Sequence, residues 1–260
     1  MIKNLIQASA FVLAISCATG CSSSMDMNRL MSAATQGIQA MTITDDQVAS
    51  YVHQSVLQMD AQNPVAPEND PYTKRLRNLT NGLTSVDGVP LNFKVYKVKD
   101  VNAFACADGS VRVFSGIMDL MTDDELLGII GHEIGHVALH HSRNAIKNEL
   151  MTGALRDAIG STSSTMAALS DSQLAQIGQA LMSAKYSQKQ ETAADDFGYD
   201  FLRGAKRNPW GMVSSFEKLE KLENGNQSSY ITQMFSSHPD TQARIAHITA
   251  RCKQDGIPRK

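Results

Sequence analysis

The amino-acid sequence predicts an α+β fold, in which a mostly helical body carries a small three-stranded sheet beside one central helix. Helix-start signals recur along the chain, each followed by apolar residues at helical spacing. Residues 91–95 instead alternate apolar and polar residues as strands do, and two further short strand candidates follow before residue 115. The chain has 260 residues, of which 42% are hydrophobic, so it is long enough to form one large domain.

Residues 1–20 have the pattern of an export signal, with a positively charged start and an apolar core at residues 8–16. Small residues then precede Cys21, as in the lipobox of bacterial lipoproteins, where the cysteine receives the lipid and becomes the first residue. We therefore predict a lipoprotein signal peptide at 1–20, lipidation of Cys21 and a tether at 21–43. A second, poorer lipobox ends at Cys17, and an ordinary cleaved secretory signal is the alternative.

Charge and hydropathy narrow the classes of partner. The formal net charge of −2 gives no basic field that would attract nucleic acid. No run of 18 apolar residues is present, which argues against a membrane-spanning helix. Ser22 follows Cys21 where Asp would retain an enterobacterial lipoprotein at the inner membrane. We expect a protein that its lipid anchors to the outer membrane, facing the periplasm.

The domain at 44–260 is predicted to open with two helices. A capping box at 44–47 starts a helix that runs to about Met59. Asp70 then serves as an N-cap before a proline at the first helical position, which starts a second helix to about Leu83.

Three strands follow these helices in the prediction. Apolar residues alternate with polar ones over 91–95, and two further apolar runs occupy 101–107 and 111–114. The Asp108-Gly109 pair between the last two runs is a strong tight-turn signal. The sequence therefore predicts a small sheet directly before the central helix.

The central helix begins at a second capping box, residues 122–125, and is expected to end near Arg143. Its residues are mainly apolar, which predicts that most of it is buried. Gly128, Gly131 and Gly135 share one face, although each costs about 1 kcal/mol relative to Ala in a helix. We therefore expect the backbone of a neighbouring element to approach this face closely.

The C-terminal half is predicted to be helical. Residues 144–186 form two helices separated by a Ser/Thr cluster at 161–165, the second starting at Ser170. Ser187 caps a helix that runs to about Arg203. The remaining signals are a helix start at Asn208-Pro209, with Trp210 as a packing residue, a turn at 223–227 and a last helix from Asp240 or Thr241.

The central helix carries a pattern suited to metal chemistry. His132 and His136 are four residues apart, so on a helix they point within about 40° of each other and can share one ion. Glu133 stands beside them, where it can take a proton from a zinc-bound water without being a ligand. The alternative is a pair of core histidines with a surface glutamate.

A third ligand has to come from elsewhere in the chain. In one type of zinc site, the same segment continues with a glycine and supplies a third histidine. Here the corresponding positions hold Leu139 and Ser142, so this type of site is excluded. The remaining solution is a glutamate on a downstream helix. Glu191 supplies one, and Glu149 is the other candidate before it.

Asp195 lies four residues after Glu191 and therefore on the same helix face. One carboxylate can bind the metal while the other accepts the remaining N–H of a ligand histidine. Asp196 competes for that second role. The small residues Ala193 and Ala194 would let this helix pack closely on the central one. A charged, solvated face is the alternative interpretation.

Four segments together resemble the gluzincin metallopeptidases of the HtpX/BepA/LoiP type. They are the run 132–136, the Glu191-x-x-x-Asp195 pair, the stretch 102–105 and the run Ser237-His238-Pro239. The likeness covers roughly residues 45–250. The two metal motifs together are specific, whereas the other two matches are weak by themselves.

The resemblance implies a zincin-like metallopeptidase domain with one zinc ion per chain. It assigns His132, His136 and Glu191 as ligands and Glu133 as general base. It implies that His238 caps the fourth zinc position in resting forms or stabilises the oxyanion. The remaining assignments are Asp195 and Arg244 as residues that support the ligands, and Asn102, Ala103, Phe104 and Ala105 as an edge strand that binds extended substrate.

We therefore expect a zinc-dependent endopeptidase of the bacterial periplasm and outer membrane. Its expected substrates are misfolded or misassembled envelope proteins, and its expected partners are envelope quality-control proteins. The alternative is a zinc-containing chaperone or assembly factor for outer-membrane proteins that seldom cuts, for which the Met- and Ala-rich segment 144–186 could supply a binding surface.

Four further residues are less informative. Cys106 and Cys252 could pair in an exported protein, or Cys106 could meet the zinc, and the sequence leaves these alternatives open. His140 and His141 follow the motif and are interpreted as residues that pack at the helix C-terminus and favour its dipole.

Overall fold

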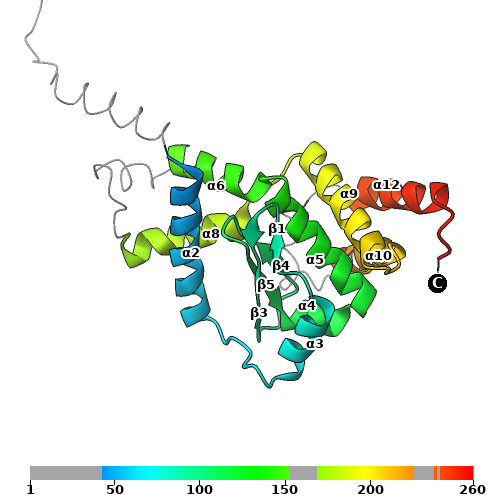
Figure 1. The fold of residues 1–260 in the computed structure, drawn as a ribbon, viewed down its shortest axis with the longest axis horizontal. Helices are drawn as coiled ribbons and strands as arrows, with labels where there is room; N and C mark the ends of the chain where they lie inside the picture. Colours follow the sequence, from blue (N-terminus) through cyan, green and yellow to red (C-terminus); the bar gives the residue numbers. More distant parts are fainter. Residues whose placement is uncertain (1–42, 153–168, 225–236, 239–240, 260) are drawn as a thin grey trace, which may run out of the picture.

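A computed structural model describes residues 43–152, 169–224, 237–238 and 241–259. These residues are mostly helical and include one three-stranded sheet, which confirms the predicted α+β class (Figure 1). The predicted signal peptide, the lipidation site at Cys21, the tether, the Ser/Thr cluster at 161–165 and most of the predicted turn at 223–227 lie outside the described residues.

The three-stranded sheet consists of β3 (Asn92–Tyr96), β4 (Ala103–Ala105) and β5 (Ser110–Phe114). β5 lies in the middle, parallel to β3 and antiparallel to β4. The strands therefore fall where the alternating pattern predicts them, with the Asp108-Gly109 turn between the antiparallel pair.

A two-stranded hairpin, β1 (Ser85–Val86) and β2 (Val89–Pro90), precedes the sheet and is absent from the sequence prediction. Its turn consists of Asp87 and Gly88, which both have positive φ angles of 45° and 77°. Asp-Gly is the preferred pair for such a turn. The signal was therefore present, but the two-residue strands are too short to produce an alternating pattern.

The two faces of the sheet belong to different cores because successive side chains of a strand point to opposite sides. Val111 and Val113 pack with the central helix α5 (Asp123–Ala138). Tyr96 and Phe114 pack with a helical layer on the other face. Figure 1 shows α2 and α5 on opposite sides of the strands.

The layer on the Tyr96 face contains α2 (Asp45–Gln62), α6 (His141–Thr152) and α8 (Asp171–Ser183). α2 and α8 begin at the predicted capping boxes of Thr44 and Ser170. Thr44 Oγ1 accepts from the Gln47 N–H while the Gln47 side chain accepts from the Thr44 N–H, and the Gln173 side chain accepts from the Ser170 N–H at 2.8 Å. Apolar side chains from all three helices cover the sheet.

The layer on the other face is built around α5. The remaining helices are α3 (Pro71–Leu79), α4 (Ser115–Leu120), α9 (Gln188–Gly204), α10 (Trp210–Asn224) and α12 (Thr241–Gln254). α3 ends a few residues earlier than predicted, and the short α4 was not predicted. Trp210 is buried, as expected, and donates its indole N–H to the Ile257 carbonyl at 2.8 Å.

α5 begins at its predicted capping box on Thr122, but the prediction that it ends near Arg143 is wrong. The helix ends at Ala138, and His140 adopts a left-handed conformation with φ 59°. This residue redirects the chain, and α6 begins at His141. Arg143 therefore belongs to the next helix.

The glycine face of α5 packs against α9, as predicted. A Cβ atom on Gly131 would lie 2.7 Å from Cδ1 of Phe201, and one on Gly135 would lie 3.1 Å from the Ala194 carbonyl oxygen. Real Cβ atoms rarely approach other atoms so closely, so a larger residue at either position would require neighbouring atoms to shift. The two helices can therefore bring their polar side chains within a few ångströms of each other.

Cys106 and Cys252 are both buried and both free, so the disulfide that the sequence left open is not formed. Cys106 lies in the core beside α2, whereas Cys252 lies in a cluster with residues of α9 and α10. Burial raises the pKa of the Cys106 thiol well above its ordinary value.

Candidate metal centre

Four buried side chains from three parts of the chain converge beside α5. His132 and His136 come from successive turns of α5, Glu191 from the first turn of α9, and His238 from the short segment 237–238. One ligand atom from each of the four lies within 4.8 Å of the others. The helical spacing therefore brings the two α5 histidines together as predicted, and the close packing of α9 brings Glu191 to them.

The distances between the four side chains fit one small ion. The Nε2 atoms of His132 and His136 are 3.1 Å apart, and the Glu191 oxygens lie 3.6 and 3.5 Å from them. His238 Nδ1 lies 3.3 Å from His132 Nε2 and 3.1 Å from Glu191 Oε1. Donors at about 2.0 Å from a tetrahedral zinc ion are about 3.3 Å from each other. The donor set therefore has the spacing that such an ion requires.

A carboxylate contacts the His132 ring nitrogen that points away from the other donors. Its Nδ1 lies 2.8 Å from Asp195 Oδ1, so its Nε2 is free to face the other donors. Arg244 donates to both oxygens of Asp195 at 2.8 and 2.7 Å. A third Arg244 nitrogen lies 3.1 Å from Glu191 Oε2, so one guanidinium fixes both carboxylates.

The competing candidate Asp196 points elsewhere. Its Oδ1 lies 2.7 Å from His247 and 2.7 Å from Arg251, both on α12. Asp195 therefore holds the position beside the ligand histidine, while Asp196 joins α9 to α12. The His247 side chain is half-buried in this pair.

The charges of the site favour ionised Glu191 and Asp195 carboxylates and a neutral His136 imidazole. Burial alone would raise the pKa of Glu191, but hydrogen bonds from His136 and His238 outweigh it and lower the pKa. Burial likewise opposes ionisation of Asp195, whose pKa is lowered by the Arg244 charge. Burial lowers the pKa of His136 well below its ordinary value, which keeps this imidazole neutral and able to bind a metal.

Glu133 is buried, yet its Oε1 has no hydrogen-bond partner in the described part of the structure. His238 Nε2 lies 3.5 Å from this atom. Buried polar atoms without a partner are rare in folded proteins and demand an explanation. An acceptor that is kept free beside a metal centre is suited to take a proton from a reacting molecule.

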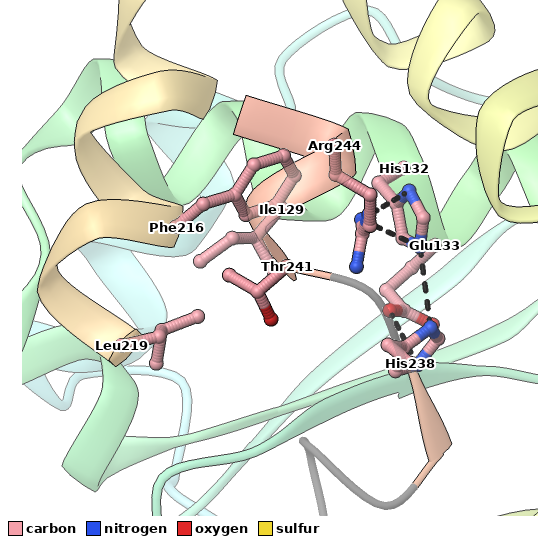
Figure 2. A pocket seen from close by; sticks show the side chains of 8 residues that line it. All are labelled: Ile129, His132, Glu133, Phe216, Leu219, His238, Thr241 and Arg244. Atoms are coloured by element: carbon pink, nitrogen blue, oxygen red, sulfur yellow. Dashed lines mark hydrogen bonds and ion pairs between the residues drawn. The ribbon is translucent and has the colours of Figure 1, made fainter. Parts of the chain in front are cut away.

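A pocket opens beside Glu133 (Figure 2). Its polar side is formed by His132, Glu133, His238 and Arg244. Its apolar side is formed by Ile129 of α5 together with Phe216 and Leu219 of α10. The free carboxylate thus borders a space that has one apolar wall and one charged wall.

The predicted substrate strand is β4, which lies at the edge of the described sheet beside α5. Ala103 and Ala105 face α5, and Asn102 directly precedes the strand. The Phe104 side chain packs instead with Tyr96 and Phe114 in the core beside α2. Any contact of Phe104 with a ligand would therefore involve its backbone.

Two residues near the ligands were missed by the sequence analysis. His141 Nδ1 lies 3.1 Å from His136 Nδ1, although His141 was interpreted as a packing residue. The Tyr186 ring stacks on the His136 ring at 3.8 Å. The prediction assumed one continuous helix, which points His141 away from His136, and no sequence pattern marked Tyr186. Cys106 is not among the four grouped donors.

Two histidines one helical turn apart, a glutamate from a neighbouring helix and a free glutamate beside them define a metallopeptidase site of the His-Glu-x-x-His class. Comparison with known proteins narrows this class. The model of peptidase family M48 matches residues 72–252, and the chain belongs to this family. The chain is thus a metalloprotease with a buried metal-binding cluster.

Relatives with similar sequences bear protease names. Metalloprotease LoiP of Escherichia coli is 45% identical over 95% of this chain and 98% of its own length. Metalloprotease YcaL of the same organism is 41% identical over 90% of this chain and 91% of its own length. The beta-barrel assembly-enhancing protease of E. coli is 27% identical over 72% of this chain but 40% of its own length. Among the described helices, none is long and apolar enough to cross a membrane.

Proposed function

We propose that the chain is a zinc-dependent endopeptidase in which His132, His136 and Glu191 hold one zinc ion and Glu133 is the general base. The observation that carries this proposal is the buried Glu133 oxygen without a hydrogen-bond partner beside the four donors. Imidazole and carboxylate ligands suit zinc, and three of them leave one position open.

When bound, zinc would polarise the scissile carbonyl and lower the pKa of the attacking water. Glu133 would accept the proton of that water and return it to the leaving amine. Asp195 would keep the proton of His132 on Nδ1, and Arg244 would hold Asp195 in place. The backbone of Asn102 to Ala105 at the sheet edge would pair with an extended substrate.

The general base has a direct test. Glu133→Gln keeps the shape of the side chain but removes its basicity, so peptide cleavage should fall about 10²–10⁴-fold. Zinc content, measured on the same purified protein, should stay at one ion per chain because Glu133 is not a ligand. Cleavage at the parent rate by this variant would overturn the mechanism, and a parent protein that binds no zinc would overturn the cofactor.

His238 would supply a fourth donor, and zinc held by four protein ligands would have no position left for water. We therefore propose that His238 leaves the donor cluster before substrate is cut, or turns to stabilise the oxyanion. His238→Ala should raise basal peptide cleavage if the residue blocks the site and lower it if the residue stabilises the transition state. An unchanged rate would exclude both roles.

The proposed location is the outer membrane, with lipid on Cys21 and the domain in the periplasm. The lipobox-like sequence before Cys21 supports this assignment. Labelled palmitate should enter the parent and the Cys17→Ala variant but not Cys21→Ala, with the label in the outer-membrane fraction. Label in Cys21→Ala would contradict the assignment.

The proposed substrates are misfolded or misassembled envelope proteins, and the proposed partners of the protease are envelope quality-control proteins in the same compartment. The similarity to the beta-barrel assembly-enhancing protease of E. coli supports this substrate class. If the chain instead serves as a chaperone that keeps its zinc, Glu133→Gln should complement a deletion strain as well as the parent gene does. Failure of the variant to complement would favour proteolysis.

A further inference from the structure

The two α5 histidines have different surroundings on the side away from the other donors. His132 Nδ1 meets Asp195 at 2.8 Å, which is the usual carboxylate partner of a ligand histidine. His136 Nδ1 instead lies 3.1 Å from Nδ1 of another histidine, His141. The second ligand therefore has an outer partner of a different chemical kind.

The positions of the nitrogens determine which one carries a proton. His136 Nε2 faces the donor cluster, so a metal needs its lone pair and the His136 proton must lie on Nδ1. Nδ1–H can donate only to a lone pair. His141 Nδ1 therefore accepts the hydrogen bond, and the proton of the neutral His141 ring lies on its Nε2.

A second contact limits rotation of the His136 ring. The Tyr186 ring lies on it with a centroid distance of 3.8 Å and an interplanar angle of 23°. The Tyr186 hydroxyl lies 3.4 Å from Ser142 Oγ. The Ser142 hydroxyl in turn donates to the Ala105 carbonyl at 3.1 Å. Tyr186 is thereby tied to both α6 and β4.

The chain reaches this arrangement through two local turns. The left-handed residue His140 ends α5 and places His141 at the start of α6, close to the preceding turn of α5. Tyr186 directly precedes Ser187, which caps α9 one turn before Glu191. The residues that contact His136 therefore lie directly beside the helices that carry the donors, since His141 follows α5 and Tyr186 precedes α9.

We propose that His141 and Tyr186 are positioning residues, which together fix the tautomer and the orientation of the His136 ring for the metal. This proposal rests on the zinc site of the proposed function. Neither residue is among the four grouped donors, so both act through His136. His141 has the role toward His136 that Asp195 has toward His132.

Zinc affinity of the full chain, measured by competition with a chromophoric chelator, tests the His141 bond. His141→Ala removes the acceptor and should weaken zinc binding about 10–100-fold. His141→Asn offers an amide oxygen near the position of Nδ1 and should restore most of the affinity. The control is His140→Asn, because His140 contacts Asp87 and asparagine tolerates its left-handed backbone.

The stack is tested in the same assay by two further variants. Tyr186→Leu should weaken zinc binding roughly three- to tenfold, whereas Tyr186→Phe keeps the ring and should bind like the parent. The absorption bands of the cobalt-substituted protein should change in His141→Ala and Tyr186→Leu and stay unchanged in His140→Asn and Tyr186→Phe.

The outcomes separate this inference from the function it rests on. If the parent protein binds zinc and both His141→Ala and Tyr186→Leu bind it with the same affinity, the positioning roles alone are overturned. Equal loss in His141→Ala and His141→Asn would overturn the hydrogen-bond role of His141. A parent protein without zinc would overturn the proposed function itself. Thermal unfolding of the metal-free variants shows whether each is folded. If His141→Ala or Tyr186→Leu does not fold, His141→Asn and Tyr186→Phe still test the two roles.

Discussion

Two buried clusters of charged residues lie on opposite faces of the same sheet and differ in one respect. In the first, Arg112 of β5 donates to both oxygens of Asp60 at 2.8 and 3.0 Å and to Asn92 at 3.0 Å. Lys94 and Tyr96 also donate to Asp60, each at 2.7 Å. Every acceptor of Asp60 thus has a donor, and the cluster is complete without any other molecule.

In the metal centre, by contrast, buried hydrogen-bond acceptors are not all matched by donors. The imidazole nitrogens that face the Glu191 oxygens are acceptors when each neutral ring carries its proton on the other nitrogen, and Glu133 Oε1 has no hydrogen-bond donor in the described chain. Acceptors crowded in a buried space repel one another unless a cation lies between them. The comparison teaches that an excess of buried acceptors marks the functional cluster, whereas the balanced cluster around Asp60 holds α2 against the sheet.

The largest effect is expected from removing a charge at the metal centre. Glu191→Gln keeps the size of the ligand but removes its negative charge, so zinc affinity should fall by more than the roughly 100-fold that loss of an outer partner causes. Peptide cleavage at limiting zinc should fall with it. Asp60→Asn is the matched control and should retain one zinc per chain. Equal zinc affinity in Glu191→Gln and the parent would contradict the assignment of the Glu191 cluster, rather than the Asp60 cluster, as the metal site.

The balanced cluster should instead affect stability. Asp60→Asn leaves the Arg112 charge buried without its partner, which costs roughly 3–5 kcal/mol in other proteins. Urea unfolding at neutral pH should therefore show a loss of about this size, while cleavage per folded molecule stays at the parent rate. Replacing Arg112 by Met in the same variant should recover part of the loss. A loss of cleavage without a loss of stability would contradict the structural role.

The same cluster should make stability depend on acid. Burial alone would raise the pKa of Asp60, but hydrogen bonds from Arg112, Lys94 and Tyr96 outweigh it and lower the pKa below its ordinary value. Asp60 therefore stabilises the fold above the pKa of the unfolded chain, about 4, and this contribution disappears as the pH falls through the lower pKa of the folded state. The difference in unfolding free energy between parent and Asp60→Asn should narrow below about pH 4. A constant difference from pH 7 to pH 3 would argue against this linkage.

The smallest effect concerns the spacing of α5 and α9. Gly135→Ala introduces a Cβ 3.1 Å from the Ala194 carbonyl, so the gain of up to about 1 kcal/mol in helix propensity should be lost to strain. Gly204→Ala, near the end of α9, meets no atom within 4 Å and should stabilise the protein by up to that amount. Thermal unfolding of both variants measures the contrast. Equal stabilisation by Gly135→Ala and Gly204→Ala would show that α5 and α9 can accommodate a Cβ atom at residue 135 without strain.

Much of the site was predictable because it depends on local spacing. A four-residue interval on a helix fixes the relation of His132 to His136, and the same interval relates Glu191 to Asp195. Strand alternation similarly predicted β3 and β5. These features require only the period of the element and the signals at its start, both of which are present in the sequence.

Features that depend on contacts between distant residues could not be predicted. The sequence does not indicate that Asp60 meets Arg112, because neither lies in a motif. The bond between His136 and His141 depends on the left-handed conformation of His140, which no glycine or asparagine marks. An unbroken helix would have turned His141 away from the ligand.

The donors of the metal centre are widely separated along the chain, since α5 supplies two, α9 the third and residue 238 the fourth. A growing or unfolded chain thus offers an ion no more than the two histidines of α5 at short range, and such a pair binds weakly. Acquisition of the ion must follow docking of the helices. If cleavage needs the ion, as proposed, a freshly synthesised chain would cut no peptide bond until its helices have docked.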